Sequence, residues 1–430
     1  MFASAYRAAT VRKRSRQAFF RSLLAAADLS GVAILLGNGK GAFERPMNIG
    51  VTIFSAAVGD FNGDGKPDLA VSAGSSVAIL AGNGKGGFQQ PFNHATDGYS
   101  RSVATADFNG DGKPDLAVLD AGVSILVGLG DGVFQTLGTY DFPAYPDQIA
   151  LADFNGEGKT DLLVATSSPD GVIVLLGNGD GAFQAPQTTP LPNAAIGVAI
   201  GDFNGDGIAD LAVTYDTSTN NLAILPGCGD GTFGNPIYTS LGGYASALAA
   251  ADLNRDGRLD LVVLEPVLNL ASILYGKGNG TFEPPVSYAV GNAPAFVAIA
   301  DLNGDGKPDL AVANAGCCGG RQISTVSVLL NDGKGVFKTS GTYPAPTGAV
   351  SIAVADFNVD GIPDLAVAAG CASILLGHGD GTFDLSPANF VVAGDAVSLV
   401  TAEFTKDGKP DLAVANSNSS NITVLTNTTP

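Results

Sequence analysis

The stretch Asp107–Val118, DFNGDGKPDLAV, has the residue spacing of a metal-binding loop. Gly112, at loop position 6, permits the sharp turn that directs the flanking side chains at one centre. Hard oxygen donors at this spacing are typical of Ca²⁺ sites. The oxygen-bearing side chains at positions 1, 3, 5 and 9 are Asp107, Asn109, Asp111 and Asp115.

Near-copies of this loop return along the whole chain. They begin at Asp60, Asp107, Asp153, Asp202, Asp252, Asp301, Asp356 and, in altered form, Glu403, so the steps are 47, 46, 49, 50, 49, 55 and 47 residues. Self-similarity at such a period indicates a repeat architecture. We therefore expect residues 22–430 to form one domain. Residues 1–21 match nothing downstream, and we interpret them as a disordered or mis-started leader.

The loops supply a large set of candidate metal ligands. The first seven loops provide Asp60, Asn62, Asp64, Asp68, Asp107, Asn109, Asp111, Asp115, Asp153, Asn155, Glu157, Asp161, Asp202, Asn204, Asp206, Asp210, Asp252, Asn254, Asp256, Asp260, Asp301, Asn303, Asp305, Asp309, Asp356, Asn358, Asp360 and Asp364. The eighth provides weaker candidates, Glu403, Thr405, Asp407 and Asp411. We expect about six to eight Ca²⁺ sites, with the third weakened by its longer Glu157 and the eighth weak or empty. The alternative is a set of Asp-Gly turns with solvated carboxylates.

Two further loop positions carry expectations. Position 2 is always Phe or Leu, which we expect to fill the core beneath the ion. Position 7 would coordinate the ion through its backbone carbonyl, so that Lys66, Ile208 and Arg258 can all occupy it. We therefore expect the side chain at position 7 to be uninformative. An EF-hand is excluded because position 12 is Val118 or Val312 within an apparent strand.

The segments between loops predict short strands. The unit Tyr288–Phe337 contains four apolar runs separated by turn residues, which fits four strands in a period near 48. Their runs of small or β-branched residues indicate sheets that are covered on both faces. A Gly-rich turn precedes a Phe in each repeat, and we expect that Phe to pack between neighbouring sheets. The predicted fold is all-β, a β-propeller of four-stranded antiparallel blades, with eight blades favoured and seven as the alternative.

The repeat resembles the FG-GAP/VCBS family, which includes the integrin α-subunit head and bacterial surface proteins. The resemblance covers roughly residues 22–430. It rests on the DxNxDGxxD loops followed by Leu-Ala-Val, on YxxGxxP at Tyr288, Gly291 and Pro294, and on the LLGxGDGxF hairpins. It implies a calcium-binding, integrin-alpha-like propeller located outside the cell or at the cell surface, often used for cell adhesion or glycan binding.

Charge and hydropathy limit the partners. A net charge of −19 disfavours nucleic acid and anionic membranes, which require a basic face. Filling the six intact loops with one Ca²⁺ each would bring the charge to −19 + 12 = −7. No run is apolar and long enough for a membrane span. The basic start of the chain is a poor export signal because Arg21 and Asp28 interrupt its apolar part.

The face opposite the metal loops is the expected ligand face. Metal loops and Gly turns should share one face, whereas the irregular loops of the other face suit recognition of a glycan or protein, unless they are simple connectors. The candidate ligand-binding residues there are His94, Tyr99, Arg101, Tyr145, Tyr244 and Arg321. We expect a monomeric recognition module and not an enzyme. A polysaccharide lyase and a purely structural assembly component are the alternatives.

The cysteines and the chain ends give two more hypotheses. Cys371 could form a disulfide with Cys317 or Cys318, whereas Cys228 should be unpaired on the loop face. The C-terminal repeat supplies only three strands, Val397–Phe404, Leu412–Asn416 and Ile422–Thr426. We expect Ala42–Ile49 to pair beside the third of them and to close an eighth blade. Val32–Leu36 would then be a surplus copy of the third strand, either displaced or a sign that the chain is a fragment.

Overall fold

The computed structural model describes residues 22–23, 32–35, 47–49, 55–85, 87–142, 146–167, 169–215, 221–316, 324–390, 396–405, 407–416 and 422–425. Regular secondary structure within these ranges is entirely β-strand. They contain no helix that is long and apolar enough to cross a membrane. The proposed leader, residues 1–21, lies outside the described ranges.

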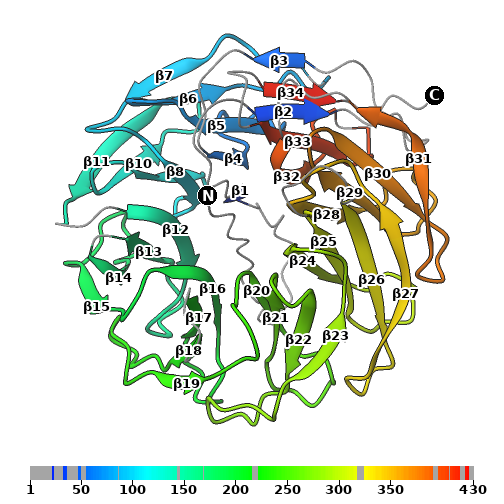
Figure 1. Ribbon diagram of the computed structural model, residues 1–430. Coiled ribbons are helices and arrows are strands. Elements are labelled where there is room, and N and C mark those ends of the chain that lie inside the picture. The colour runs from blue at the N-terminus through cyan, green and yellow to red at the C-terminus, as the bar shows by residue number, and fades with distance from the viewer. Residues whose placement is uncertain are drawn as a thin grey trace.

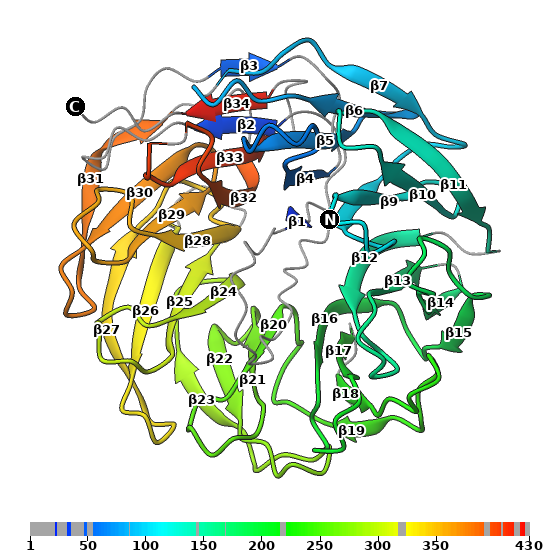
Figure 2. The same cartoon turned by 180° about the vertical axis from the view of Figure 1, so that it is seen from behind.

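In this part of the chain the strands form eight antiparallel sheets, arranged as blades of a propeller (Figures 1 and 2). Blade 1 contains β4 (Ala56–Gly59), β5 (Asp68–Ser72), β6 (Ser76–Leu80) and β7 (Phe92–Ala95), with β1 (Ser22–Leu23) added at β4. Blade 2 contains β8 (Ser102–Ala106), β9 (Asp115–Leu119), β10 (Val123–Gly128) and β11 (Phe134–Tyr140). Blade 3 contains β12 (Pro146–Ala152), β13 (Asp161–Ser167), β14 (Asp170–Leu175) and β15 (Gln187–Pro190).

The later blades repeat the arrangement. Blade 4 contains β16 (Ala195–Gly201), β17 (Asp210–Tyr215), β18 (Leu222–Leu225) and β19 (Ile237–Thr239). Blade 5 contains β20 (Leu248–Ala251), β21 (Asp260–Glu265), β22 (Leu270–Leu274) and β23 (Val286–Ala289). Blade 6 contains β24 (Pro294–Ala300), β25 (Asp309–Asn314), β26 (Thr325–Asn331) and β27 (Phe337–Pro344). Blade 7 contains β28 (Ser351–Ala355), β29 (Asp364–Ala368), β30 (Ala372–Gly377) and β31 (Phe383–Phe390).

Each blade buries its middle strands and exposes its outer one. Every residue of β9 is buried, whereas most of β23 is exposed. The first strand of each blade lies nearest the ring axis and the fourth lies at the rim (Figure 1). The apolar runs of the middle strands therefore pack against neighbouring blades on both faces, as the sequence predicted.

Pairs of phenylalanines fill the junctions between blades. The position-2 Phe of one metal loop meets the hairpin Phe of the next blade edge-on, with ring centroids 5.7 Å apart for Phe61 and Phe134 and 6.3 Å apart for Phe203 and Phe282. Phe61 and Phe203 are fully buried. Edge-to-face pairs at these distances add to the energy of burial. Burial of the position-2 Phe in the core and packing of the hairpin Phe between neighbouring blades are therefore confirmed.

The ring closes between the two ends of the chain. Blade 8 contains β32 (Ala396–Ala402), β33 (Asp411–Asn416) and β34 (Ile422–Leu425), joined by β2 (Val32–Leu35) and β3 (Met47–Ile49). Strand β3 pairs with β34, with Met47 opposite Val424. The rings of Phe88 in blade 1 and Phe404 in blade 8 lie 6.0 Å apart. Closure of an eighth blade by the N-terminal strand is therefore confirmed.

The surplus third strand is placed in the closing sheet and is not displaced from it. Strand β2 pairs with β33, with Leu35 opposite Leu412, and β34 places Leu425 opposite the same Leu412. Both also pair with β3. Strands β2 and β34 therefore pair with the same residues of β33 and with the same strand β3, so both are assigned to the third-strand position of blade 8.

Truncation tests this closure. Removal of residues 1–20 should leave the melting temperature nearly unchanged, because β1, β2 and β3 all remain. Removal of residues 1–50 should lower it by several degrees and promote aggregation, because β34 loses its pairing with β3 and a sheet edge is exposed. Differential scanning calorimetry with light scattering measures both effects. Equal melting of the two truncated proteins would show that β3 does not stabilise the ring.

Candidate metal centre

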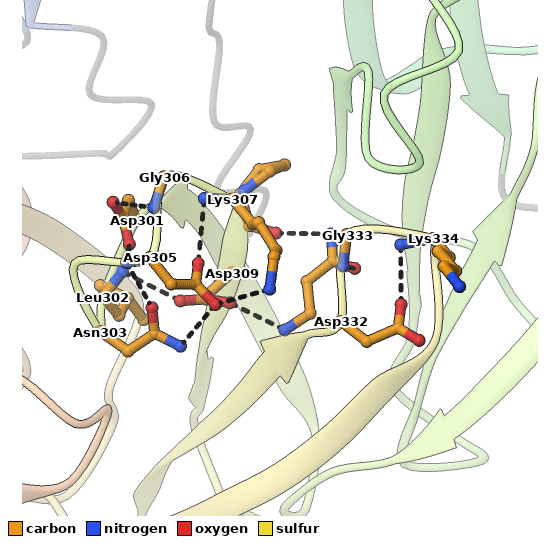
Figure 3. A network of polar contacts seen from close by, with 12 residues as sticks. Asp301, Leu302, Asn303, Asp305, Gly306, Lys307, Asp309, Asp332, Gly333 and Lys334 are labelled. Atoms are coloured by element: carbon orange, nitrogen blue, oxygen red, sulfur yellow. Dashed lines mark hydrogen bonds and ion pairs between the residues drawn. The ribbon is translucent and has the colours of Figure 1, made fainter.

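The candidate metal loops join the first and second strands of their blades and lie beside the Gly turn of the same blade. Figure 3 shows this for blade 6, where the loop from Asp301 to Asp309 lies against the hairpin at Asp332–Lys334. Loop and hairpin are joined by a hydrogen bond from the Asn331 backbone N–H to Asp309 Oδ1, at 2.7 Å. The predicted placement of metal loops and Gly turns on one face is confirmed.

The side chains at positions 1 and 3 shape the turn. In blade 6, Asp301 Oδ2 accepts a hydrogen bond from the Gly306 N–H at 2.8 Å. Asp301 Oδ1 and Asn303 Oδ1 both accept from the Asp305 N–H, at 3.1 and 2.9 Å. Gly306 has a φ of 79°, which a side chain rarely tolerates. These hydrogen bonds stabilise the turn, because Asx side chains substitute for backbone acceptors.

The carboxylate at position 9 joins three segments of the chain. In blade 4, Asp210 Oδ2 accepts from the N–H groups of Phe203 and Asn204, and Oδ1 accepts from the Gly227 N–H at 2.7 Å. Burial raises the pKa of Asp210 to about 6, because the charged form loses its hydration. The same connection from position 9 to position 2 and to the hairpin recurs at Asp68, Asp115, Asp161, Asp260, Asp309 and Asp364. We call this arrangement the aspartate clasp.

The clasp explains the glycine that ends the third strand. A Cβ on Gly128 would lie 2.3 Å from the carbonyl oxygen of Pro114, so a side chain at this place in blade 2 would force the hairpin away from the loop. Blade 6 has Asn331 at this place, and its amide donates to the carbonyls of Leu253 at 2.7 Å and Pro308 at 3.0 Å. Because Leu253 belongs to blade 5, this side chain also connects neighbouring blades.

Backbone hydrogen bonds connect the metal loop of one blade to the hairpin of the next. The Gly132 N–H donates to the Phe61 carbonyl at 3.0 Å, and the Gly280 N–H donates to the Phe203 carbonyl at 2.9 Å. The Gly181 N–H makes the equivalent bond to Phe108. A change in loop geometry therefore acts directly on the packing between blades.

The side chain at position 7 is informative, contrary to the expectation, because in most loops it contacts the carboxylate at position 5. Lysines at this position approach the carboxylate at position 5, with Nζ to oxygen distances of 2.5 Å for Lys66 and Asp64 and 2.9 Å for Lys307 and Asp305. Lys159 makes the same contact with Glu157, at 2.7 Å. Longer contacts, of 3.6 to 4.0 Å, join Lys113 to Asp111, Arg258 to Asp256 and Lys409 to Asp407. A residue pattern along the chain does not reveal this contact, since it depends on how the turn folds.

The loop residues suit a hard cation in their chemistry. Every candidate ligand offers oxygen, which Ca²⁺ prefers. Asp60 Oδ1 is buried without a hydrogen-bond partner, so it is available to a cation. Within the described ranges no three carboxylate, imidazole or thiolate side chains converge as a ready metal site. The amide at position 3 and the carbonyl at position 7 would therefore have to complete the set formed by positions 1, 5 and 9.

The candidate ligand-face residues do not gather at one place. His94 lies on β7, and its Nε2 is 3.0 Å from Thr136 Oγ1 on β11. Tyr99 and Arg101 are exposed in the link from blade 1 to blade 2. Tyr244 lies in the link from blade 4 to blade 5. Two further candidates, Tyr145 and Arg321, lie outside the described residues.

Sequence reasoning missed a set of buried polar residues on the face opposite the metal loops. In blades 2 to 6 they lie five residues after the clasp aspartate, at or just beyond the end of the second strand. They are Asp120, Thr166, Tyr215, Glu265 and Asn314. Tyr215 Oη, Glu265 Oε2 and Asn314 Oδ1 have no hydrogen-bond partner. Blades 1 and 7 have Ala73 and Ala369 there. Aligning the repeats on the clasp aspartate would have shown that this position differs from blade to blade.

The cysteine hypothesis is only partly confirmed. Cys228 is an exposed free thiol in the Gly turn of blade 4, as expected. Cys371 is also a free thiol, so the hypothesised disulfide is not formed. It lies in the tight turn before β30, where its carbonyl accepts from the Ala369 N–H, and burial raises the pKa of its thiol. Cys317 and Cys318 lie outside the described residues.

Comparisons with known proteins agree with this architecture. A family model described as an FG-GAP-like repeat matches residues 23–71, 60–118, 153–213, 202–263, 269–312 and 316–367, which together make up more than half of the chain. No curated protein matches the chain.

Solved structures similar to this chain match it at low identity. One is dihydro-heme d1 dehydrogenase NirN, at 12% identity and a TM-score of 0.52, covering 88% of this chain and 76% of that one. Another is an Agrocybe aegerita lectin that recognises non-reducing terminal N-acetylglucosamine, at 19% identity and a TM-score of 0.49, covering 90% and 99%. A functionally unknown protein from Desulfotomaculum acetoxidans matches at 12% identity and a TM-score of 0.48, covering 80% and 96%. At these identities the likeness concerns the fold alone.

Removal of one clasp tests its role. In the presence of a chelator, Asp210→Ala should lower the free energy of unfolding by roughly 1–3 kcal/mol for each buried N–H left without an acceptor. The control is Asp230→Ala, which removes an exposed carboxylate that accepts only from Thr232 in the hairpin of the same blade and should change the free energy by no more than about 1 kcal/mol. Urea denaturation measures both. Equal values for the two variants would contradict a structural role of the clasp.

Proposed function

Since the chain belongs to the FG-GAP-like repeat family, we propose that it is a calcium-stabilised β-propeller that acts outside the cell or at the cell surface as a recognition or adhesion module. One observation carries this proposal. The loop face repeats the same acidic turn and clasp in blade after blade, whereas the second-strand ends on the opposite face differ in every pair of neighbouring blades between blade 1 and blade 7. Variation on a rigid scaffold is typical of a ligand-binding surface.

The calcium part of the proposal rests on charge and position. Each of the first seven loops places three carboxylates and one Asn within nine residues, and their mutual repulsion opposes the turn. A bound Ca²⁺ would offset that repulsion, held by positions 1, 3, 5 and 9 and by the position-7 carbonyl. Because each loop is hydrogen-bonded to its hairpin, and several to the next blade, stabilising the loops would stabilise the ring.

The recognition part rests on the polar groups at the second-strand ends. A buried polar atom without a partner costs stability, and such atoms are kept most readily where they serve binding. Glu265 illustrates the point, since its Oε1 accepts from Ser272 while Oε2 lacks a partner. Hydroxyl-rich glycans and the backbone of a protein both offer donors for such an acceptor, which is buried in this structure and would be reached only after the chain that covers it moves. We propose one of these as the ligand of a monomeric propeller.

Calcium removal tests the structural role of the loops. Millimolar Ca²⁺ should raise the melting temperature relative to excess EGTA, because each site that binds only the native state adds RT ln(1 + [L]/Kd). Asp111→Ala should reduce this calcium-dependent increase more than Asp407→Ala, because the eighth loop already has Glu403 and Thr405 in place of Asp and Asn. Differential scanning fluorimetry provides the readout. A midpoint that does not respond to calcium would overturn the calcium proposal.

A ligand screen tests the recognition role. A glycan array, run alongside a lyase assay on pectic substrates, should give calcium-dependent binding to a defined set of glycans without bond cleavage. Substituting Tyr99 or Arg101 with Ala, on the face opposite the metal loops, should weaken the binding of a ligand that docks between blades 1 and 2. Lys334→Ala, on the loop face, should leave that binding unchanged. Cleavage of pectic chains would favour the enzymatic alternative. Absence of any glycan binding would restrict the proposal to protein ligands.

A further inference from the structure

We propose that the metal loops of blades 4 and 7 are the two tight calcium sites of the ring, because the other six loops contain a cation of their own. This inference rests on the proposed calcium binding. It concerns the side chain at loop position 7, which is Ile208 in blade 4 and Ile362 in blade 7. In the remaining loops that position is Lys or Arg.

The internal cation sits on the carboxylate that a metal would need. Lys307 Nζ lies 2.9 Å from Asp305 Oδ2, and Lys159 Nζ lies 2.7 Å from Glu157 Oε2. Asp305 Oδ2 accepts from both Lys307 and the amide of Asn303. The corresponding oxygen of Asp206 in blade 4 receives the neutral amide hydrogen bond, from Asn204 Nδ2 at 2.9 Å, without a lysine. Asp360 in blade 7 is bound in the same way by the amide of Asn358. Among the described residues neither Asp206 nor Asp360 forms an ion pair.

Lysine and isoleucine occupy the same place on the hairpin. A Cβ built on Gly333 would lie 2.7 Å from Lys307 Cδ, and one built on Gly229 would lie 3.1 Å from Ile208 Cδ1. The aliphatic stem of the lysine therefore packs where the isoleucine side chain packs, and only the ammonium group differs. Exchange of the two residues changes the charge of the loop with little change in its packing.

The ammonium group weakens calcium binding in two ways. Its ion pair with position 5 must break before that carboxylate can turn to the metal. Its positive charge then remains close to the divalent ion, and a unit charge about 6 Å away weakens binding roughly tenfold even at the dielectric constant of water. Because these side chains are partly exposed, salt reduces the effect, so the contrast between loops should be largest at low ionic strength.

Blade 4 gives the cleaner test of the two. Position 4 of its loop is Gly205, with a φ of 81°, whereas blade 7 has Val359 there at a φ of 61°. A β-branched residue in this left-handed region is strained, so calcium affinity in blade 7 reflects both charge and strain. Blade 6 also has a glycine at position 4, Gly304 at a φ of 75°, so strain at this position does not distinguish blade 4 from blade 6.

The experiment is a calcium titration by isothermal calorimetry on chelator-stripped protein at low salt, with circular dichroism in excess calcium to verify folding. The wild-type chain should show about two tight sites, followed by weaker ones. Ile208→Lys should reduce the tight class to about one, and Lys307→Ile should raise it to about three. Val336→Lys adds the same charge to an exposed hairpin residue on the loop face and should leave the number of tight sites at two.

The outcomes separate this inference from the proposed function. If the wild-type chain binds calcium but neither exchange changes the number of tight sites, the inference is overturned while calcium binding stands. If Val336→Lys removes a tight site as Ile208→Lys does, overall charge and not position 7 sets affinity, which also overturns it. A wild-type chain that takes up no calcium overturns both. Opposite shifts in the two exchange variants support the inference, and Lys307→Ile does so even if Ile208→Lys fails to fold.

Discussion

The structure depends on a buried carboxylate that accepts backbone hydrogen bonds from two separate segments. In the aspartate clasp, one oxygen holds the start of the metal loop and the other holds the end of the third strand. Burying a charge is costly, and the raised pKa of Asp260, to about 6, reflects that cost. Charge-assisted bonds to otherwise unpaired N–H groups offset it. The clasp fixes the loop relative to the hairpin, so the position-2 Phe and the hairpin Phe face their partners across the junctions.

The junctions turn this local arrangement into a ring. The loop of blade 4 contributes Phe203, which packs against Phe282 of blade 5, while its carbonyl accepts from Gly280 of the same hairpin. Each clasp therefore stabilises its own blade and also positions the surface on which the next blade packs. An ion bound by loop positions 1, 3, 5, 7 and 9 would act on the same unit of loop and hairpin. This coupling explains how small exposed loops can influence the stability of a large ring.

The sequence predicted what depends on period and residue type. Blade order, the all-β fold, the aromatic junctions and closure through Met47–Ile49 follow from recurring residues whose roles are local. The role of Asp210 as a clasp could not be separated from that of a metal ligand, because a carboxylate suits both. The contact between Lys307 and Asp305 forms only once the turn has folded. The burial of Glu265 depends on the link from blade 4 to blade 5, where Gly242 and Gly243 lie beside its carboxylate. The shared register of β2 and β34 is likewise a property of the closed sheet.

The two faces of the ring are subject to different structural constraints. On the loop face, a substitution of the clasp aspartate removes the acceptor of hydrogen bonds that blades 1 to 7 share, so these blades resemble one another. At the far end of the second strand no such bond is required, and Tyr215, Glu265 and Asn314 each bury a polar atom that no described residue satisfies. Such atoms lower stability by about 1–3 kcal/mol each. A scaffold fixed at one face by clasps can tolerate that cost at the other.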